Sequence, residues 1–170
     1  MKFMSNILNT LTKHITENQI LPADQMAHGF DEMMEGRASP VQIAAFLIAL
    51  KMRGETPSDI AAGATSLRRH ALTIDAPNIA MDIVGTGGDG IGTYNISTAT
   101  AIVLAGAGIP VAKHGNKAVS SKSGAADVLT ELGINLDCPV EALTEALTTA
   151  KIAFLMAPRH HNAMRHVGPI

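Results

Sequence analysis

The sequence predicts an α/β protein in which a small all-helical domain precedes a parallel-sheet α/β domain. Over residues 1–72 the apolar residues recur at helical spacing, and helix-start signals are frequent. Over residues 80–170 short apolar runs alternate with helical patterns, which is typical of a parallel sheet with helical crossovers. The stretch between them, residues 73–79, contains a proline and several polar residues and is expected to be a linker.

The helical domain is expected to contain four helices. The first covers about residues 6–17, with apolar residues on one face, and the second begins at Pro22, a good first-turn residue, and runs to about residue 35. A capping-box pattern with proline at the first helical position opens the third helix at residues 39–42 and the fourth at 56–59. The third helix is apolar almost all round, which predicts burial. This domain carries little obvious chemistry, so packing or dimerisation is its expected role.

The α/β domain is expected to contain three strands, with a glycine-bearing loop after each of the first two. The predicted strands cover residues 81–84, 109–114 and 152–157. The predicted helices cover residues 95–107, 123–133, 139–150 and 158–167. Ligands of open parallel sheets lie beyond the carboxyl ends of the strands. The two loops are therefore the candidate site.

Composition excludes several classes of protein. At 170 residues with 46% hydrophobic content the chain can form a core, while a net charge of −2 and 3% aromatic residues disfavour a nucleic-acid surface. A single cysteine, Cys138, excludes an internal disulfide and a cysteine-based zinc site. The first residues are too polar for a signal peptide, and no apolar run approaches the length of a membrane span. We expect a cytoplasmic protein with no nucleic-acid or membrane partner.

Residues 82–124 carry the groups that a polyphosphate ligand needs. Between Asp89 and Asp127 there is no acidic residue, while Lys113, Lys117 and Lys122 all lie there. Glycine-rich backbone, hydroxyl groups and ammonium groups without carboxylates favour an anionic ligand. Solvent exposure remains an equal alternative for the second and third of these lysines.

The first loop, residues 85–90, also fits the dinucleotide pattern G-x-G-x-x-G. The acidic residue that an NAD site needs about 20 positions further on is missing, so only an NADP-dependent oxidoreductase stays open. Asp89 suits a ligand hydroxyl or a nearby metal. At the start of the next helix, Asn95 and Ser97 either cap the helix or hold phosphate oxygens, and Ser97 offers a ligand to Mg²⁺.

The second loop begins at the end of the second strand. Lys113 is placed to act as a point charge on phosphate, and Asn116 offers a donor and an acceptor to a planar polar substrate. After the third strand comes a basic cluster that includes His160 and His161. Helix surface is the expected role of His160, whereas His161 is retained as a neighbour of the substrate.

Four motifs together resemble the anthranilate phosphoribosyltransferase family: D-I-V-G-T-G-G-D-G at 82–90, N-I-S-T at 95–98, K-H-G-N-K-A-V-S-S at 113–121 and H-N-A-M-R at 161–165. The resemblance covers essentially the whole chain. It implies transfer of the phosphoribosyl group of phosphoribosyl pyrophosphate (PRPP) to the amine of anthranilate, with Mg²⁺ and release of pyrophosphate, in tryptophan biosynthesis. A homodimer formed through the helical domain is the expected assembly.

Carried over position by position, the resemblance implies that PRPP contacts Gly85, Gly88, Asp89, Thr93, Asn95, Ile96, Ser97, Thr98, Lys113, His114, Gly115, Asn116, Lys117, Ala118, Val119, Ser120, Ser121 and Ala125. Ser97 is the implied Mg²⁺ ligand. Gly85 and Asn116 would border anthranilate, with His114 and His161 near it. The family often has serine where this chain has Ala125, so one phosphate hydrogen bond would be missing. No residue is expected as a catalytic acid or base, because positioning of the neutral aromatic amine should count for more.

The resemblance also implies that the α/β domain is truncated. Family members are considerably longer, and their acidic Mg²⁺-binding pair and the arginine for the anthranilate carboxylate follow the segment that here ends V-G-P-I. Two relatives of the same fold remain as alternatives, a pyrimidine nucleoside phosphorylase and a non-catalytic nucleic-acid-binding protein. The run G-N-K-A-V-S-S-K-S-G favours the transferase over the first, and the near-neutral charge disfavours the second.

Overall fold

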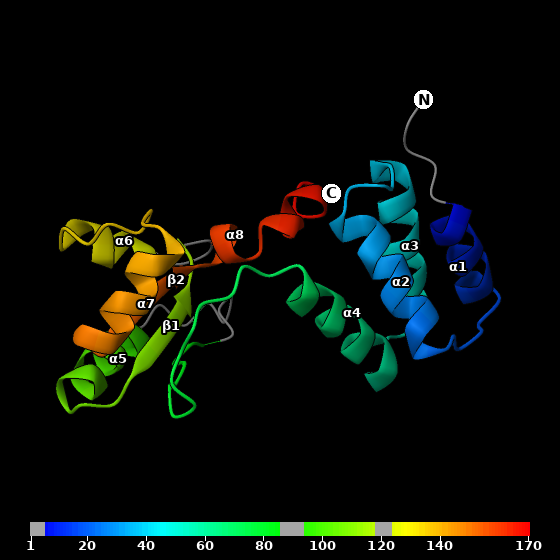
Figure 1. Ribbon diagram of the computed structural model, residues 1–170. Coiled ribbons are helices and arrows are strands. Elements are labelled where there is room, and N and C mark those ends of the chain that lie inside the picture. Colours follow the sequence, from blue (N-terminus) through cyan, green and yellow to red (C-terminus); the bar gives the residue numbers. More distant parts are fainter. Residues whose placement is uncertain (1–5, 86–93, 118–123) are drawn as a thin grey trace. The chain divides into compact units, whose positions relative to one another are not determined.

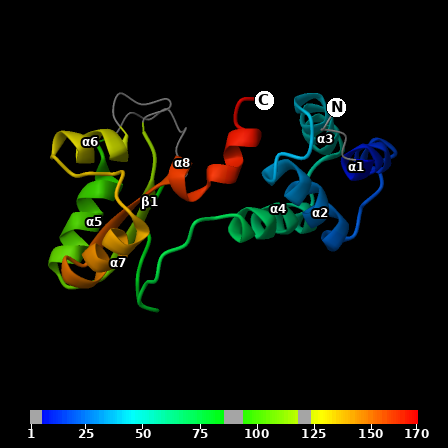
Figure 2. The ribbon, with the colours of Figure 1, turned by 45° about the horizontal axis from the view of Figure 1, so that its top comes forward.

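The computed structural model describes residues 6–85, 94–117 and 124–170, which form two compact units (Figures 1 and 2). The helical unit comprises the chain up to Ala71 together with His161–Ile170, and the α/β unit comprises Leu72–His160. The last ten residues therefore group with the helices, although the sequence places them in the α/β domain. Their contacts explain this, since Val167 packs on the helical core and the His166 ring lies against Gly36.

The four helices expected in the helical unit are present. They are α1 (Asn6–Thr16), α2 (Ala23–Met34), α3 (Pro40–Arg53) and α4 (Pro57–Arg69), and the 3₁₀ helix η1 (Asn162–His166) joins them from the end of the chain. Their shared core consists of Leu8, Leu11, Ile15, Leu21, Met26, Met33, Ala38, Ile43, Phe46, Ala49, Leu50 and Ala62. Phe30 packs edge-on against Phe46 with ring centroids 5.6 Å apart. This unit has its own hydrophobic core.

Local hydrogen bonds start α3 and α4 as the sequence predicts. The Ser39 hydroxyl accepts from the N–H of Gln42, and the Thr56 hydroxyl accepts from the N–H of Asp59, each within a complete capping box. The Asp59 carboxylate also pairs with Arg53, and both side chains are almost fully buried. A buried ion pair thus fixes the turn between the two helices.

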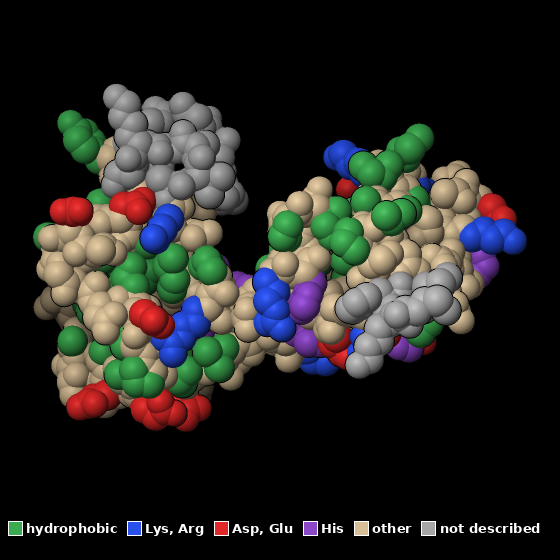
Figure 3. Space-filling view, turned by 90° about the horizontal axis from the view of Figure 1, so that it is seen from above, with side chains coloured by type: hydrophobic (Ala, Val, Ile, Leu, Met, Phe, Trp, Pro, Cys, Tyr) green, Lys and Arg blue, Asp and Glu red, His purple; other side chains and the backbone are tan. Residues whose placement is uncertain are grey.

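The prediction that α3 is buried all round is wrong. Ile43, Phe46 and Leu50 are buried, but Val41, Ile48 and Met52 are 78%, 60% and 84% exposed. The helices of this unit cover only one face of α3, and Figure 3 shows hydrophobic side chains gathered on the visible face of the unit. Like every helix in the described part of the chain, α3 lacks the length and apolarity needed to cross a membrane.

The α/β unit contains a two-stranded parallel sheet in its described residues. Its elements are α5 (Ile96–Gly106), β1 (Val111–Gly115), α6 (Ala125–Glu131), α7 (Val140–Thr149), β2 (Ile152–Met156) and α8 (Ala157–His160). The register runs from Val111 opposite Ile152 to Gly115 opposite Met156. Because side chains alternate along a strand, Ala153 faces α7 while Phe154 faces α6. Helices therefore cover both faces of the sheet.

The strand predicted at residues 81–84 is reduced to one bridge, between Met81 and Val111. Two backbone hydrogen bonds flank this bridge, from Met81 N–H to the Pro110 carbonyl and from Ala112 N–H to the Met81 carbonyl, both 2.9 Å. Beyond it the N–H of His114 donates to the Asp82 carboxylate at 3.0 Å instead of to a backbone carbonyl. The side chain of Asp82 thus ends the strand pairing that the apolar pattern predicts.

The prediction that His160 lies on a helix surface is also wrong. Its side chain is buried at the end of α8, and Nδ1 of its ring lies 2.7 Å from the carbonyl of Leu72. The N–H of Leu72 in turn donates to the carbonyl of His160 at 2.8 Å. These two contacts join the first and last residues of the α/β unit, so His160 has a structural role.

Candidate functional site

The candidate site centres on Lys113, a buried lysine in β1. Its side chain is only 2% exposed, and its ammonium donates to the Ile83 carbonyl at 2.7 Å and to the Ser97 hydroxyl at 3.3 Å. A longer contact of 3.5 Å reaches the carbonyl of His114. The lysine therefore joins the segment before the first loop, the start of α5 and the end of β1. Sequence reasoning predicts a charge at this strand end, and the structure adds that it is buried.

The electrostatics of Lys113 leave room for an anion. Burial lowers the pKa of the Lys113 ammonium, and the nearby Asp82 carboxylate opposes this by raising it. Among the described residues, the hydrogen-bond acceptors of the ammonium are two carbonyls and a hydroxyl, all of them uncharged. A buried charge without a directly bonded counter-ion is costly. A bound phosphate would supply the missing negative charge.

The start of α5 presents further unused polar groups. Among the described residues the Asn95 side chain makes no capping hydrogen bond, and Asn95 Nδ2 and the Thr98 hydroxyl are buried without a partner. The first N–H groups of a helix also lack intrahelical acceptors, and they form its positive end. The contact between Lys113 and Ser97 brings the ammonium to this same helix start, and donors of these kinds suit phosphate oxygens.

The end of β1 and the start of α6, which flank the second loop, lie close together. The carbonyl of Asn116 accepts from the N–H of Ala126 at 3.2 Å, which ties the strand end to the first turn of α6. Gly115 makes this approach possible, because a Cβ there would lie 2.9 Å from Cε2 of Phe154 and 3.3 Å from Cβ of Ala125. The loop is thus closed at its base by backbone contact and close packing.

The structure brings together part of the predicted set. Ser97 and Lys113 are in contact, and β1 and its following residues place His114, Gly115, Asn116 and Lys117 in sequence at the same strand end, with Ala125 against Gly115. Gly85 and the Ile96 side chain are exposed. His161 belongs to the other unit. The predictions on Gly88, Asp89, Thr93, Ala118, Val119, Ser120 and Ser121 lie outside the described residues.

Sequence reasoning missed two contributors, Asp82 and Ile83. Asp82 accepts from the backbone of His114, and the carbonyl of Ile83 holds the Lys113 ammonium. The available signal was a carboxylate inside a short apolar strand pattern, since such a side chain competes with the backbone for hydrogen bonds.

The described residues fit Mg²⁺ only when the ion arrives with a phosphate ligand. They contain no group of three or more His, Cys, Asp or Glu side chains that could hold a metal. Ser97 supplies a hydroxyl oxygen, and Asp89 lies outside the described residues. Mg²⁺ in phosphate-transferring enzymes usually keeps several waters and is bound by few protein ligands together with substrate phosphates.

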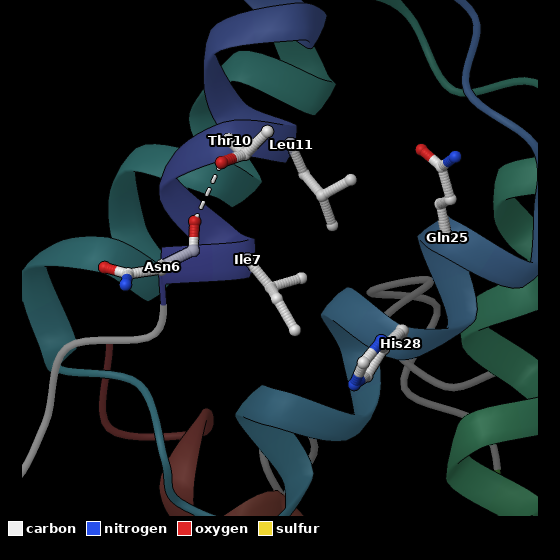
Figure 4. Close-up of a pocket in the computed structure, with 6 residues that line it drawn as sticks. All are labelled: Asn6, Ile7, Thr10, Leu11, Gln25 and His28. Carbon is white, nitrogen blue, oxygen red and sulfur yellow. Dashed lines mark hydrogen bonds between the residues drawn. The ribbon is translucent and has the colours of Figure 1, made fainter.

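A separate hollow of about 340 Å³ lies between α1 and α2. Figure 4 shows Ile7 and Leu11 of α1 facing Gln25 and His28 of α2 across it, with Asn6 and Thr10 at its rim. The Thr10 hydroxyl donates to the backbone carbonyl of Asn6 at 2.9 Å. The described residues that line it include no lysine or arginine, which distinguishes them from the strand-end site.

The fold and the site define a class of protein: a small helical bundle joined to a parallel α/β unit with a buried lysine and a helix start at the end of a strand. The chain belongs to a glycosyl transferase family. Residues 77–170 match the model described as glycosyl transferase family, a/b domain, and residues 9–71 match the helical bundle domain of the same family.

Similar proteins are anthranilate phosphoribosyltransferases, which confirms the resemblance carried by the four motifs. The protein from Azospirillum brasilense is 59% identical over 140 residues, covering 82% of this chain and 39% of that protein. The crystal structure of the Thermus thermophilus enzyme has a TM-score of 0.86 at 42% identity, covering 94% of this chain and 49% of the other. The Saccharomyces cerevisiae enzyme, in complex with PRPP and Mg, gives 0.84 at 29%, covering 98% and 50%. The chain thus spans half or less of these relatives' length.

Proposed function

We propose that this chain binds the phosphates of PRPP, with Mg²⁺, as part of an enzyme that transfers the phosphoribosyl group to anthranilate. The products would be N-(5-phosphoribosyl)anthranilate and pyrophosphate, in tryptophan biosynthesis. The observation that carries the proposal is the buried Lys113 ammonium in contact with Ser97 at the start of α5, a helix start where polar atoms of Asn95 and Thr98 are also unpaired. The names of the similar proteins support the same substrates.

The residues suit the charge that this reaction develops. The bond between the anomeric carbon and the pyrophosphate oxygen breaks, its electron pair leaves with pyrophosphate, and positive charge builds on the ribose ring. The Lys113 ammonium and the first N–H groups of α5 would stabilise the leaving oxygens, because they are held in place before the reaction begins. Mg²⁺, when bound with the pyrophosphate, would neutralise further negative charge.

Anthranilate would be positioned rather than activated by a strong base. Its aromatic amine carries a free lone pair at neutral pH, so the task of the site is to hold that nitrogen near the anomeric carbon. Asn116 and Gly85, both exposed in the described chain, are the proposed borders of its site, with His114 beside them. We assign no catalytic acid or base.

Calorimetric titration of the chain with PRPP and Mg²⁺ tests the proposal. We expect saturable binding that weakens by roughly tenfold to a hundredfold in Lys113→Ala, because hydrogen bonds to charged groups contribute about 1.5–3 kcal/mol. Lys51→Ala, which removes an exposed lysine of the helical unit, is the matched control. Omission of Mg²⁺ should also weaken binding. Binding of inorganic phosphate and a pyrimidine nucleoside in place of PRPP would contradict the proposal and favour a phosphorylase.

We also propose that two copies of the chain associate through the helical unit. The exposed apolar side chains of α3, which include Val41, Ile48 and Met52, give a face that a second copy would cover. Light scattering after size exclusion should give the mass of a dimer, and Ile48→Glu should give a monomer. A wild-type monomer at high protein concentration would contradict this. We also propose a cytoplasmic location, as expected from the sequence.

A further inference from the structure

We propose that Asp82 is a positioning residue of this phosphate site. Its carboxylate takes the place of the Ile83 carbonyl at the N–H of His114 and leaves that carbonyl free to hold the Lys113 ammonium. The inference rests on the proposed function, because it concerns the same site, and it adds a residue that the motif-derived set of contacts does not contain.

The hydrogen bonds of Met81 show which backbone hydrogen bond would follow if the parallel pairing continued. In a parallel pair one residue donates to a carbonyl and accepts from an N–H two positions further along the neighbouring strand. Met81 does both, with Pro110 and Ala112. If the pairing continued by two residues, the N–H of His114 would donate to the carbonyl of Ile83.

The observed contacts replace that bond by two others. The N–H of His114 donates to Oδ1 of Asp82 at 3.0 Å, and the carbonyl of Ile83 accepts from Nζ of Lys113 at 2.7 Å. One side chain has substituted for a backbone carbonyl, and the released carbonyl has become an acceptor for the buried lysine. The ammonium is thereby brought within 3.3 Å of the Ser97 hydroxyl at the start of α5.

The surroundings of Asp82 argue against a packing role. The residue is exposed, so its removal creates no cavity in the core. Its carboxylate also opposes the effect of burial on the pKa of Lys113. The consequence of losing Asp82 should therefore appear mainly in the geometry of Lys113 and His114.

Two variants separate the hydrogen bond from the charge. Asp82→Asn keeps an oxygen that accepts from His114 but loses the charge, whereas Asp82→Ala loses both. Asp75→Ala, which removes an exposed aspartate of the same unit, is the matched control. The measurements are calorimetric affinity for PRPP with Mg²⁺, amide hydrogen exchange at His114 without ligand, and a urea unfolding curve to verify that each variant is folded.

We expect Asp82→Ala to weaken PRPP binding about tenfold and to accelerate exchange of the His114 amide by a similar factor, as loss of one hydrogen bond to a charged group implies. Asp82→Asn should stay within about threefold of the wild type in both measurements. An Asp82→Ala affinity equal to that of Asp75→Ala would overturn the inference. So would equal losses in Asp82→Asn and Asp82→Ala, because charge alone would then account for the effect.

The exchange measurement separates this inference from the proposed function. A folded wild-type chain that binds no PRPP would contradict the proposed function. In that case unchanged His114 exchange in Asp82→Ala would overturn the role of Asp82 as well, whereas accelerated exchange would support its hold on the end of β1.

Discussion

The two units use buried charge in different ways. In the helical unit the buried Arg53 is paired with the buried Asp59, whose carboxylate also completes the cap of α4. In the α/β unit the buried Lys113 donates, among the residues that the structure describes, only to uncharged oxygens, and the Asn95 side chain at the start of the neighbouring helix makes no capping hydrogen bond. The first arrangement pairs opposite charges within the unit, although Oδ1 of Asp59 is itself buried without a partner, while the second holds its cation with neutral acceptors at a strand end. That contrast is what separates a structural ion pair from a ligand site.

The largest effect that the contrast predicts is on stability in the helical unit. Arg53→Ala leaves the buried Asp59 carboxylate without its cation and should lower the free energy of unfolding by about 3–5 kcal/mol. Urea unfolding followed by circular dichroism measures this. A loss below about 1 kcal/mol would mean that the pair is not a main support of the turn between α3 and α4.

The close approach of β1 to α6 predicts the next largest effect. Gly115→Ala places a methyl group against the Phe154 ring and should cost about 1–3 kcal/mol, because well-packed cores resist added volume. Gly106→Ala in α5 is the control, since a Cβ there meets nothing within 4 Å and alanine favours a helix. Thermal unfolding of the two variants should show shifts of opposite sign.

The starts of α3 and α5 should respond differently when their N-cap residue is changed, since a helix cap contributes about 1 kcal/mol to the free energy of unfolding. Ser39→Ala removes a cap that accepts from Gln42 and should cost about that much in unfolding free energy. Asn95→Ala removes a residue that caps nothing, so its effect on unfolding should be a few tenths of a kcal/mol, with weaker PRPP binding as its main consequence. Equal stability losses in the two variants would contradict the view that the start of α5 is kept for a ligand.

The smallest predicted effect concerns Ala125, where the resembling family often has serine. Ala125→Ser should tighten PRPP binding by about twofold to threefold, because an added hydroxyl next to the second loop offers one more hydrogen bond. Calorimetry under identical Mg²⁺ conditions measures this. Ala142→Ser, in the separate helix α7, serves as the control and should leave the affinity unchanged.

Structural features were predictable from the sequence when they depend on residues close together in the chain. The capping boxes at Ser39 and Thr56 depend on residues three positions apart, and both were predicted. The strand at 81–84 depended on contacts about thirty positions away, where Asp82 and Lys113 divert the backbone hydrogen bonds. The burial of α3 was overestimated because apolar residues do not reveal which face has a neighbour.

Only part of the candidate site could be predicted from the sequence, because only part of it depends on local signals. The strand-end position of Lys113 followed from alternation of strands and helices. The burial of Lys113 and its hydrogen bond to Ile83 depend on β1, the segment before the first loop and the start of α5 lying together in space. The spacing of residues in the sequence does not reveal this. Of the motif-derived residues, the pair Ser97 and Lys113 is the one for which the described structure gives a direct side-chain contact.

One variant of Lys113, measured in two ways, tests most directly whether this lysine binds a ligand or supports the fold. Lys113→Met keeps much of the volume of the buried lysine and removes its charge. We predict that this variant loses PRPP binding by at least about tenfold while its unfolding free energy stays within about 1 kcal/mol of the wild type, or rises, because a buried charge gives way to an apolar group. A variant that unfolds several kcal/mol more easily yet binds PRPP normally when folded would contradict this prediction. Lys113 would then be a structural residue, and the phosphate site would lie elsewhere.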